Sequence, residues 1–279
     1  MVAPAAKTLR RRAVIPVYVI NLARSRERRA WMEGELGREG IAGIFVRAVD
    51  GRRFGARCED AAKANPARRQ LSRAEAALTL SHRKVWRRFL ASGARHAAIF
   101  EDDIHLGKNI RQILDLDWTR WEFDAVKLET LFHVVWLERR GRPAGERTLH
   151  RLGAEHLASA AYLISRAGAK KMLAATRDFS KPLDHILFGR RPIGEGAFLA
   201  LQLVPAIAVQ DTMRPNAEKR GELASTLHEA DRKQLAAKAK REKPKGFERL
   251  RREAKRLAEQ WCRWIRLSPK MHRRRVPWE

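Results

Sequence analysis

Cysteine is scarce in this chain, and long apolar runs are missing. Only two of the 279 residues are cysteine, Cys58 and Cys262, and no CxxC pattern is present. That spacing argues against a disulfide framework and against a cysteine-based zinc site. No apolar stretch approaches the roughly 18 residues that cross a bilayer, and the first apolar run is not followed by the cleavage site of a signal peptide. We therefore expect a protein that is not secreted.

Several common catalytic and binding signatures are also missing. The sequence holds no Walker A loop, GxGxxG, HExxH or GxSxG, and no RNP motif or zinc finger is visible. Acidic residues are the minority, with 32 Asp and Glu against 59 Lys and Arg, so the formal net charge is +27. Such a charge favours an acidic partner, whether nucleic acid, anionic lipid or a phosphorylated substrate.

Apolar runs rich in β-branched residues alternate with helical patterns through the first 212 residues. Strands are predicted at 14–20, 44–49, 97–100, 124–129, 131–137, 157–165 and 200–209, the last interrupted at Pro205. Helices are predicted at about 25–36, 71–93 and 166–177. This alternation predicts an α/β fold with a mainly parallel central sheet flanked by helices.

The clearest helix begins at a capping box. Ser72 and Glu75 have the spacing at which each side chain bonds the other's backbone N–H. Gly93 is placed to end the helix. The residues that recur at helical spacing between these points are Leu78, His82, Val85 and Phe89.

Charge becomes denser after about Asp211. Within this part of the chain, apolar residues recur at steps of three and four among many Arg and Lys: Phe247, Leu250, Ala254, Leu257, Trp261 and Trp264. The pattern predicts a basic amphipathic helix, which either lies on an anionic membrane surface or docks on the protein's own body or a second subunit. We expect one domain over residues 10–212 and a basic, partly helical extension over residues 213–279.

Three consecutive acids follow the predicted strand at 97–100. Ligands gather at the carboxyl ends of strands in open α/β sheets, and Glu101, Asp102 and Asp103 stand at such an end. In an extended segment Glu101 and Asp103 share a side and Asp102 points the other way. The pair offers hard oxygen ligands to Mg²⁺ or Mn²⁺, which can bridge to phosphates of a substrate. The alternative is a solvated acidic turn balanced by nearby Arg.

A family resemblance covers residues 14–210. The segments "VYVINLARSRERRAWMEGEL", "AVDG", "LSRAEAALTLSHRKVWRRFLASGARHAAIFEDDI", "DAVKLE", "AAYLISRAGAKKML" and "KPLDHILF" occur in this order. Together they resemble glycosyltransferase family 25, the lipooligosaccharide-biosynthesis transferases. The resemblance implies a GT-A, Rossmann-like fold, a UDP-galactose or UDP-glucose donor, and inversion at the anomeric carbon.

The same resemblance implies roles for individual residues. Glu101 and Asp103 would serve the metal and the ribose, with Asp102 beside them. The residues implied to line the donor pocket are Asn21, Arg24, Arg28, Asp50, Ser81 and His82. By their residue types alone, the two arginines could be solvated helix charges, and His82 could be a buried histidine with a hydrogen-bond partner.

Transfer of a sugar also needs a base for the acceptor hydroxyl, and a carboxylate suits that task. Asp184 is the first candidate and Glu129, which closes the predicted strand at 124–129, is the second. Asp184 could instead cap a helix that starts there. His185 could complete the metal shell through a neutral imidazole, or it could be a surface histidine.

We therefore expect an inverting transferase that moves a hexose to a lipooligosaccharide or related acceptor with help from Mn²⁺ or Mg²⁺. It would work at the cytoplasmic face of a bacterial inner membrane, held there by the basic extension, without binding a specific nucleic acid. Two alternatives remain open: a nucleic-acid-binding protein that uses the basic body and tail, and an inactive transferase-like membrane scaffold.

Overall fold

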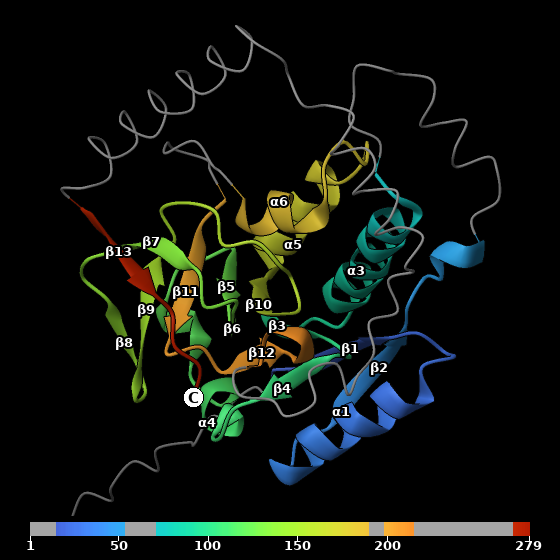
Figure 1. The fold of residues 1–279 in the computed structure, drawn as a ribbon, viewed down its shortest axis with the longest axis horizontal. Helices are drawn as coiled ribbons and strands as arrows, with labels where there is room; N and C mark the ends of the chain where they lie inside the picture. The colour runs from blue at the N-terminus through green and yellow to red at the C-terminus, as the bar shows by residue number, and fades with distance from the viewer. Residues whose placement is uncertain (1–14, 54–70, 190–197, 215–269) are drawn as a thin grey trace, which may run out of the picture.

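A twisted mixed sheet forms the centre of the protein (Figure 1). The computed structural model describes residues 15–53, 71–189, 198–214 and 270–279. The eight strands of the main sheet, in spatial order, are β2 (Gly43–Arg47), β1 (Val17–Asn21), β3 (His96–Glu101), β10 (Ala161–Ser165), β5 (Ala125–Lys127), β11 (Ala200–Val204), β9 (Arg147–Arg151) and β8 (Arg142–Ala144).

Helices cover both faces of this sheet. One face carries α3 (Arg73–Ala91), α5 (Arg166–Ala175) and α6 (Leu183–Phe188), which contact one another. The other face carries α1 (Arg26–Arg38) and the short α4 (Ile110–Leu114) (Figure 1). The remaining short turns are the 3-10 helices η1 (Gly51–Arg53), η2 (Trp118–Arg120) and η3 (Asp211–Met213).

Burial on both faces explains why the first strand reads as a continuous apolar run. Val17 and Val19 face the cluster formed with α1, whereas Tyr18 and Ile20 face the cluster formed with α3. All five residues of β1 are buried, so neither face alternates with polar residues.

The predicted capping box forms at the start of α3. Ser72 Oγ accepts from Glu75 N at 3.1 Å, and a Glu75 oxygen accepts from Ser72 N at 2.8 Å.

The sheet is mixed, which corrects the mainly parallel arrangement predicted from the sequence. β1 runs parallel to β2 and β3, and β5 runs parallel to β11. β10, however, runs antiparallel to both of its neighbours, β3 and β5. A strand that is buried on both faces is apolar whether it runs parallel or antiparallel to its neighbours. The composition of β10 therefore did not reveal its direction.

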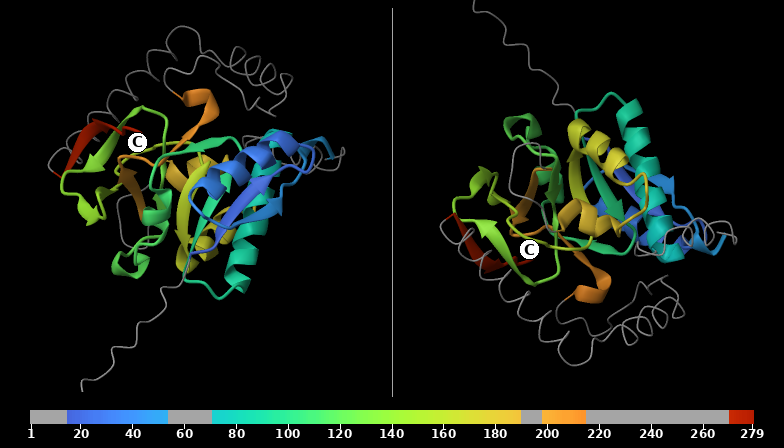
Figure 2. Two further views of the ribbon diagram at one scale, coloured as in Figure 1. Left: turned by 90° about the horizontal axis from the view of Figure 1, so that it is seen from below. Right: turned by 90° about the horizontal axis from the view of Figure 1, so that it is seen from above.

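Two smaller sheets extend the fold beside the main one. β12 (Ala208–Gln210) lies between β4 (Ile104–Leu106) and β6 (Glu129–Thr130). Separately, β7 (Val134–Glu138) pairs with β13 (Met271–Arg275), which lies near the end of the chain. Both views in Figure 2 place this last strand against the body of the molecule.

The last ten residues therefore pack on the folded body, although the sequence places them in the extension predicted over residues 213–279. Ala206 N donates to Pro277 O at 2.8 Å, Glu279 N donates to Ala206 O at 3.2 Å, and Val276 is fully buried. The predicted amphipathic helix, including Trp261 and Trp264, lies outside the described residues.

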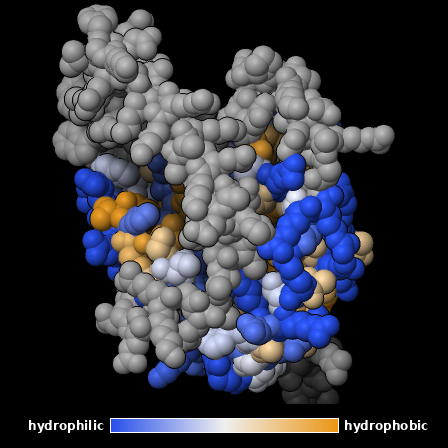
Figure 3. All heavy atoms as spheres, turned by 45° about the vertical axis from the view of Figure 1, so that its right-hand side comes forward, coloured by the Kyte–Doolittle hydropathy of each residue, from blue (hydrophilic) through white to orange (hydrophobic). Residues whose placement is uncertain are grey.

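The surface is mostly polar where the structure describes it. On the face drawn in Figure 3, hydrophilic side chains form most of the coloured surface. Among the described residues, the large apolar side chains that are exposed are Val134 at 48% and Met213 at 38%. No helix in the described ranges is long and apolar enough to cross a membrane.

Candidate active site

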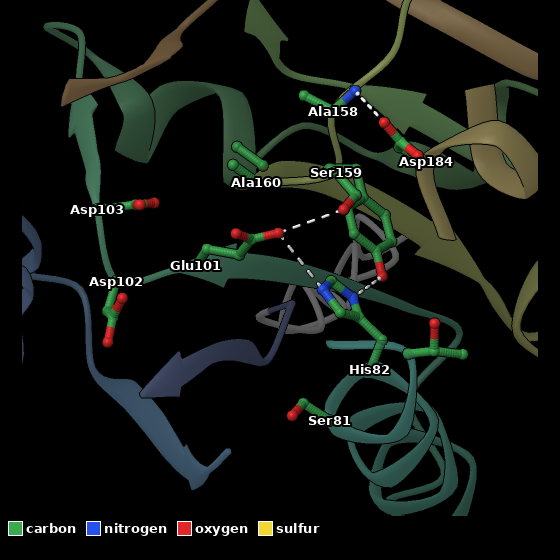
Figure 4. Close-up of polar contacts among 12 residues, drawn as sticks. Ser81, His82, Glu101, Asp102, Asp103, Ala158, Ser159, Ala160 and Asp184 are labelled. Carbon is green, nitrogen blue, oxygen red and sulfur yellow. Dashed lines mark hydrogen bonds and ion pairs between the residues drawn. The ribbon is translucent and has the colours of Figure 1, made fainter. Parts of the chain in front are cut away.

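The three acids lie at the carboxyl end of β3, next to the end of β1. Ile20 of β1 is in register with Glu101, and the chain bends at Asp102 and Asp103 before β4 begins. Figure 4 shows Glu101 and Asp103 on one side of this segment and Asp102 on the other. The structure therefore has the alternation that an extended segment predicts.

Asp102 is held by protein groups on both of its oxygens. Asn21 Nδ2 donates to Oδ2 at 2.7 Å, and Arg28 donates to Oδ1 at 2.9 Å. All three side chains are buried, and Arg28 also lies 3.5 Å from Asp103 Oδ2. This arrangement ties the acidic turn to β1 and α1. It does not favour the predicted roles of Asn21, Arg28 and Asp102 in binding the donor directly, because their polar groups already bond one another.

Arg24 and Asp50 form an ion pair with each other at the carboxyl ends of β1 and β2. Both side chains are partly exposed, so they are open to a bound molecule. Ser81 is used differently: its Oγ accepts from Val49 N at 2.8 Å and donates to Ala77 O at 2.7 Å. Ser81 thus fastens the segment after β2 to α3, and it is buried, which does not favour the predicted contact with the donor.

Glu101 and Asp103 are carboxyl groups in an unfavourable environment for negative charge. Burial, followed by the charges of Glu129 and Asp102, raises the pKa of Glu101 to about 8. Burial and the charge of Glu101 raise the pKa of Asp103 to about 7 against the opposing effect of Arg28. Both side chains nevertheless keep about a fifth of their surface open, 18% and 20%.

These two carboxyl groups fit a divalent cation. Asp103 Oδ1 is buried without a hydrogen-bond partner in the described part of the chain. A cation would give that oxygen a partner and would reduce the electrostatic repulsion between the acids. Magnesium is commonly held by only one or two carboxylates together with substrate phosphates. Two protein ligands are therefore enough.

The predicted third ligand, His185, does not join this pair. Its side chain is exposed on α6, and in the described ranges no group of three or more His, Cys, Asp or Glu is arranged to hold a metal. The sequence placed His185 near the site through its neighbour Asp184, but helical geometry points adjacent residues in different directions.

His82 is fully buried beneath the acids, on α3. Its Nδ1 lies 2.8 Å from Tyr162 Oη, and the same oxygen accepts from Trp86 Nε1 at 3.0 Å. Its Nε2 lies 3.5 Å from Glu101 Oε1. Burial lowers the pKa of His82 to about 3, so the ring is neutral. His82 is thus a buried histidine with a hydrogen-bond partner, as its residue type allows. It also lies next to Glu101, close to the site that the family resemblance implies.

The segment 158–161 forms one wall of the site. Ser159 Oγ donates to Glu101 Oε1 at 3.2 Å, and Ala158 N donates to Asp184 Oδ2 at 3.3 Å. Consecutive residues of this segment therefore touch the candidate metal ligand and the candidate base (Figure 4). Ala158 itself has a left-handed φ of 71°, a conformation that must be held by its surroundings.

A buried ion pair holds that segment from behind. Lys127 Nζ lies 2.8 Å from Glu129 Oε1 and donates to Ala158 O at 2.7 Å. The same Glu129 oxygen accepts from Ala160 N at 2.7 Å. Glu129 is 0% exposed, which does not fit the predicted base for a bound acceptor, because no acceptor hydroxyl can reach it. Its negative charge also contributes to the raised pKa of Glu101.

Asp184 remains open enough to act on a substrate. It is half-buried in the first turn of α6, two residues after the capping position at Pro182, so it is not the N-cap residue. Its Oδ1 accepts from the backbone N–H of His185 at 2.8 Å. Asp184 is thus a partly open carboxylate that contacts the segment which also contacts Glu101.

Sequence reasoning missed Ser159 and Lys127. A lysine two residues before a glutamate in an apolar strand is a detectable sign of a buried ion pair, since period-two spacing puts both side chains on one face. Ser159 carries no such sign, because its contact with Glu101 depends on how β10 pairs with β3.

Comparison with known proteins now adds to this geometry. The family profile described as "Glycosyltransferase family 25 (LPS biosynthesis protein)" matches residues 14–187. The chain is 31% identical over 228 residues to the lacto-N-neotetraose biosynthesis glycosyltransferase LgtB of Neisseria gonorrhoeae, covering 77% of this chain and 81% of that one. It is 27% identical over 155 residues to the lipooligosaccharide biosynthesis protein lex-1 of Haemophilus influenzae, covering 51% of each.

A solved structure of a glycosyltransferase involved in glycosylation of the major capsid of PBCV-1 aligns over 75% of this chain and 96% of that one. The TM-score is 0.38 and the identity 9%, too low to support an argument. The sequence comparisons are stronger, because the profile covers more than half of the chain and LgtB matches over most of both lengths. The chain therefore belongs to glycosyltransferase family 25, and it is a glycosyltransferase.

Proposed function

We propose that this enzyme transfers a hexose from a UDP-hexose donor to a lipooligosaccharide or related glycoconjugate, with inversion at the anomeric carbon, on a GT-A-like fold. The observation that carries the proposal is the pair of Glu101 and Asp103 at the carboxyl end of β3. The pKa values of both carboxyl groups are raised, both side chains are partly open, and one oxygen of Asp103 has no hydrogen-bond partner among the described residues.

The leaving group sets the main electrostatic demand. When the bond between the sugar's anomeric carbon and the diphosphate oxygen breaks, negative charge builds up on UDP. Mn²⁺ or Mg²⁺ held by Glu101 and Asp103 would neutralise part of that charge. Arg24, which pairs with Asp50 at the neighbouring strand ends, is a partly exposed cation that could assist. Arg28 acts indirectly, since it holds the acidic turn in place.

Asp184 is the proposed general base. In a single displacement the acceptor oxygen forms a bond to the anomeric carbon as the bond to UDP breaks, and the hydroxyl proton passes to the Asp184 carboxylate. Its position supports this role, because one short segment joins it to the acidic pair through Ala158 and Ser159.

The acceptor and the location follow from the relatives and from charge. The names of LgtB and lex-1 refer to lacto-N-neotetraose and to lipooligosaccharide biosynthesis. A lipid-linked acceptor would place the enzyme at the cytoplasmic face of a bacterial inner membrane. The net charge of +27 would favour that anionic surface.

Donor hydrolysis and transfer provide the test. We would measure UDP release from a panel of UDP-sugars with Mn²⁺ and an oligosaccharide acceptor, for wild type, Asp103→Asn and Asp184→Asn. The proposal predicts release from one UDP-hexose, with losses of at least about a hundredfold in both variants. Asp115→Asn, a change at an exposed pair with Arg111, is the matched control and should leave the rate unchanged.

The alternatives give different results in the same experiment. A scaffold would bind vesicles but release no UDP from any donor. A nucleic-acid-binding protein would show salt-sensitive RNA or DNA binding that survives Asp103→Asn. Either outcome, without transfer by wild type, would overturn the proposal.

A further inference from the structure

A chain of polar contacts leads from the core to Glu101. Trp86 and His82 both lie on α3, and Tyr162 lies on β10 across from them. All three side chains are fully buried. The contacts run from Trp86 Nε1 to Tyr162 Oη at 3.0 Å, from Tyr162 Oη to His82 Nδ1 at 2.8 Å, and from His82 Nε2 to Glu101 Oε1 at 3.5 Å.

Hydrogen-bond accounting fixes where the protons lie along this chain. An indole N–H can only donate, so Tyr162 Oη accepts from Trp86. The tyrosine proton then needs an acceptor, and within the described structure His82 Nδ1 is the one available. Nδ1 is therefore unprotonated, and the ring proton lies on Nε2, which faces Glu101. A histidine protonated at Nδ1 would leave the buried tyrosine proton without a partner.

The described side chains that contact the carboxyl group of Glu101 all contact one oxygen, Oε1. Ser159 Oγ donates to Oε1 at 3.2 Å, and His82 Nε2, which has no hydrogen-bond partner in the described structure, lies 3.5 Å from the same oxygen. No hydrogen bond from a described residue reaches Oε2, and Figure 4 shows that oxygen on the side of Asp103. The separation of 3.5 Å is longer than a normal hydrogen bond, and such contacts commonly shorten when the substrate complex forms.

We propose that Trp86 and Tyr162 hold His82 as the Nε2–H tautomer, and that His82 is a positioning residue which keeps Oε2 of Glu101 directed toward the metal and nucleotide. The inference rests on the proposed function for the ligand role of Glu101. It adds three residues that orient a ligand without touching the substrate. Partners of this kind commonly change metal affinity by 10- to 100-fold when they are removed.

The tautomer can be measured without metal or donor. Protein with ¹⁵N-labelled histidine, examined by NMR at a pH above the raised pKa of Glu101, which is about 8, reports which nitrogen of each ring carries the proton. The His82 signals are assigned by their loss in His82→Gln. We expect Nε2–H in wild type and a mixture or a reversal in Tyr162→Phe. Tyr18→Phe is the matched control, because Tyr18 is the chain's other tyrosine and packs in the same apolar cluster outside the relay.

The functional consequence is measured as Mn²⁺ affinity in the presence of UDP by calorimetry. His82→Gln places an amide N–H near the position of Nε2, whereas the shorter His82→Asn does not reach it. We expect about a 10- to 100-fold loss of affinity in His82→Asn and a much smaller loss in His82→Gln. Tyr162→Phe should also weaken binding, and Tyr18→Phe should not. Melting curves of each variant check that the fold is retained.

Two results would overturn the proposal: a wild-type ring protonated at Nδ1, or equal Mn²⁺ affinities in His82→Gln and His82→Asn. Failure of the proposed function looks different. In that case wild type itself binds no Mn²⁺ in the presence of UDP. The NMR measurement still shows whether Trp86 and Tyr162 hold His82 in the Nε2–H form.

Discussion

The ring of His156 donates one hydrogen bond and accepts another, so it is neutral. Nδ1 lies 2.8 Å from Gln202 Oε1, and Nε2 accepts from Leu131 N at 3.4 Å. The Gln202 amide nitrogen donates to backbone carbonyls, so its oxygen is left to accept. Burial, and then the charge of Lys127, lowers the pKa of His156 to about 3. A second proton has no place in this arrangement.

The pH dependence of stability should therefore include a contribution from His156. The unfolded chain binds a proton at His156 below about pH 6.5 and the folded protein does not, so stability present at neutral pH is lost as the pH falls from about 6.5 toward 3. The uptake of one proton by the unfolded chain lowers the free energy of unfolding by about 2 kcal/mol between pH 6.5 and pH 5. In His156→Asn this part of the slope should disappear. Urea denaturation of both proteins across this range measures it, and parallel curves would contradict the assignment.

At the same scale, the sequence predicted part of the geometry around the candidate site and not the rest. The shared side of Glu101 and Asp103 could be predicted because alternation along an extended segment is a local rule. The same rule placed Asp102 on the opposite side but did not reveal its partners, because its contacts with Asn21 and Arg28 join residues 81 and 74 positions apart. Ser159 and Tyr162 reach the site only through strand pairing between β3 and β10. Such pairing leaves no periodic signal in the sequence.

Among the elements, those with local signals were predicted well. The capping box, the apolar spacing and a glycine with a φ of 77° define α3 from its first turn to its end. β13 had no such signal. Its sequence, MHRRR, shows neither alternation nor β-branched residues, and its pairing with β7 spans more than a hundred residues of chain.

The contact of the last residues with β7 gives a prediction at this scale. Val276 is fully buried in a cluster with Val135, Leu137 and Ala206. Val276→Asp would bury an unpaired carboxylate there, so we expect a loss of several kcal/mol of stability and a lower melting temperature. Arg274→Asp, an exposed position two residues earlier, is the matched control and should change stability by less than about 0.5 kcal/mol. Similar melting temperatures for both variants would show that this strand does not dock as described.

For the molecule as a whole, the return of residues 270–279 changes how the basic extension can be tested. A deletion that runs to the C-terminus removes β13 together with the basic segment, and so confuses membrane binding with folding. Substitutions that keep the chain length avoid this difficulty.

We predict that Trp261→Ala combined with Trp264→Ala weakens binding to anionic vesicles several-fold, since tryptophan at the apolar edge of a basic helix inserts at the membrane interface. Transfer to a soluble acceptor should be retained. Sedimentation with vesicles and an activity assay measure the two effects, and neutral vesicles serve as the control. Equal loss of both activities would instead favour docking of this segment on the catalytic body.

The account as a whole depends on two oxygens, one from Glu101 and one from Asp103, sharing a cation with UDP. A crystal grown with UDP and Mn²⁺, with diffraction data collected at the manganese absorption edge, locates the ion directly. We predict an anomalous peak within bonding distance of Glu101 Oε2, Asp103 Oδ1 and the diphosphate oxygens. A peak coordinated by other residues, or ordered UDP with no peak beside these two acids, would contradict the account.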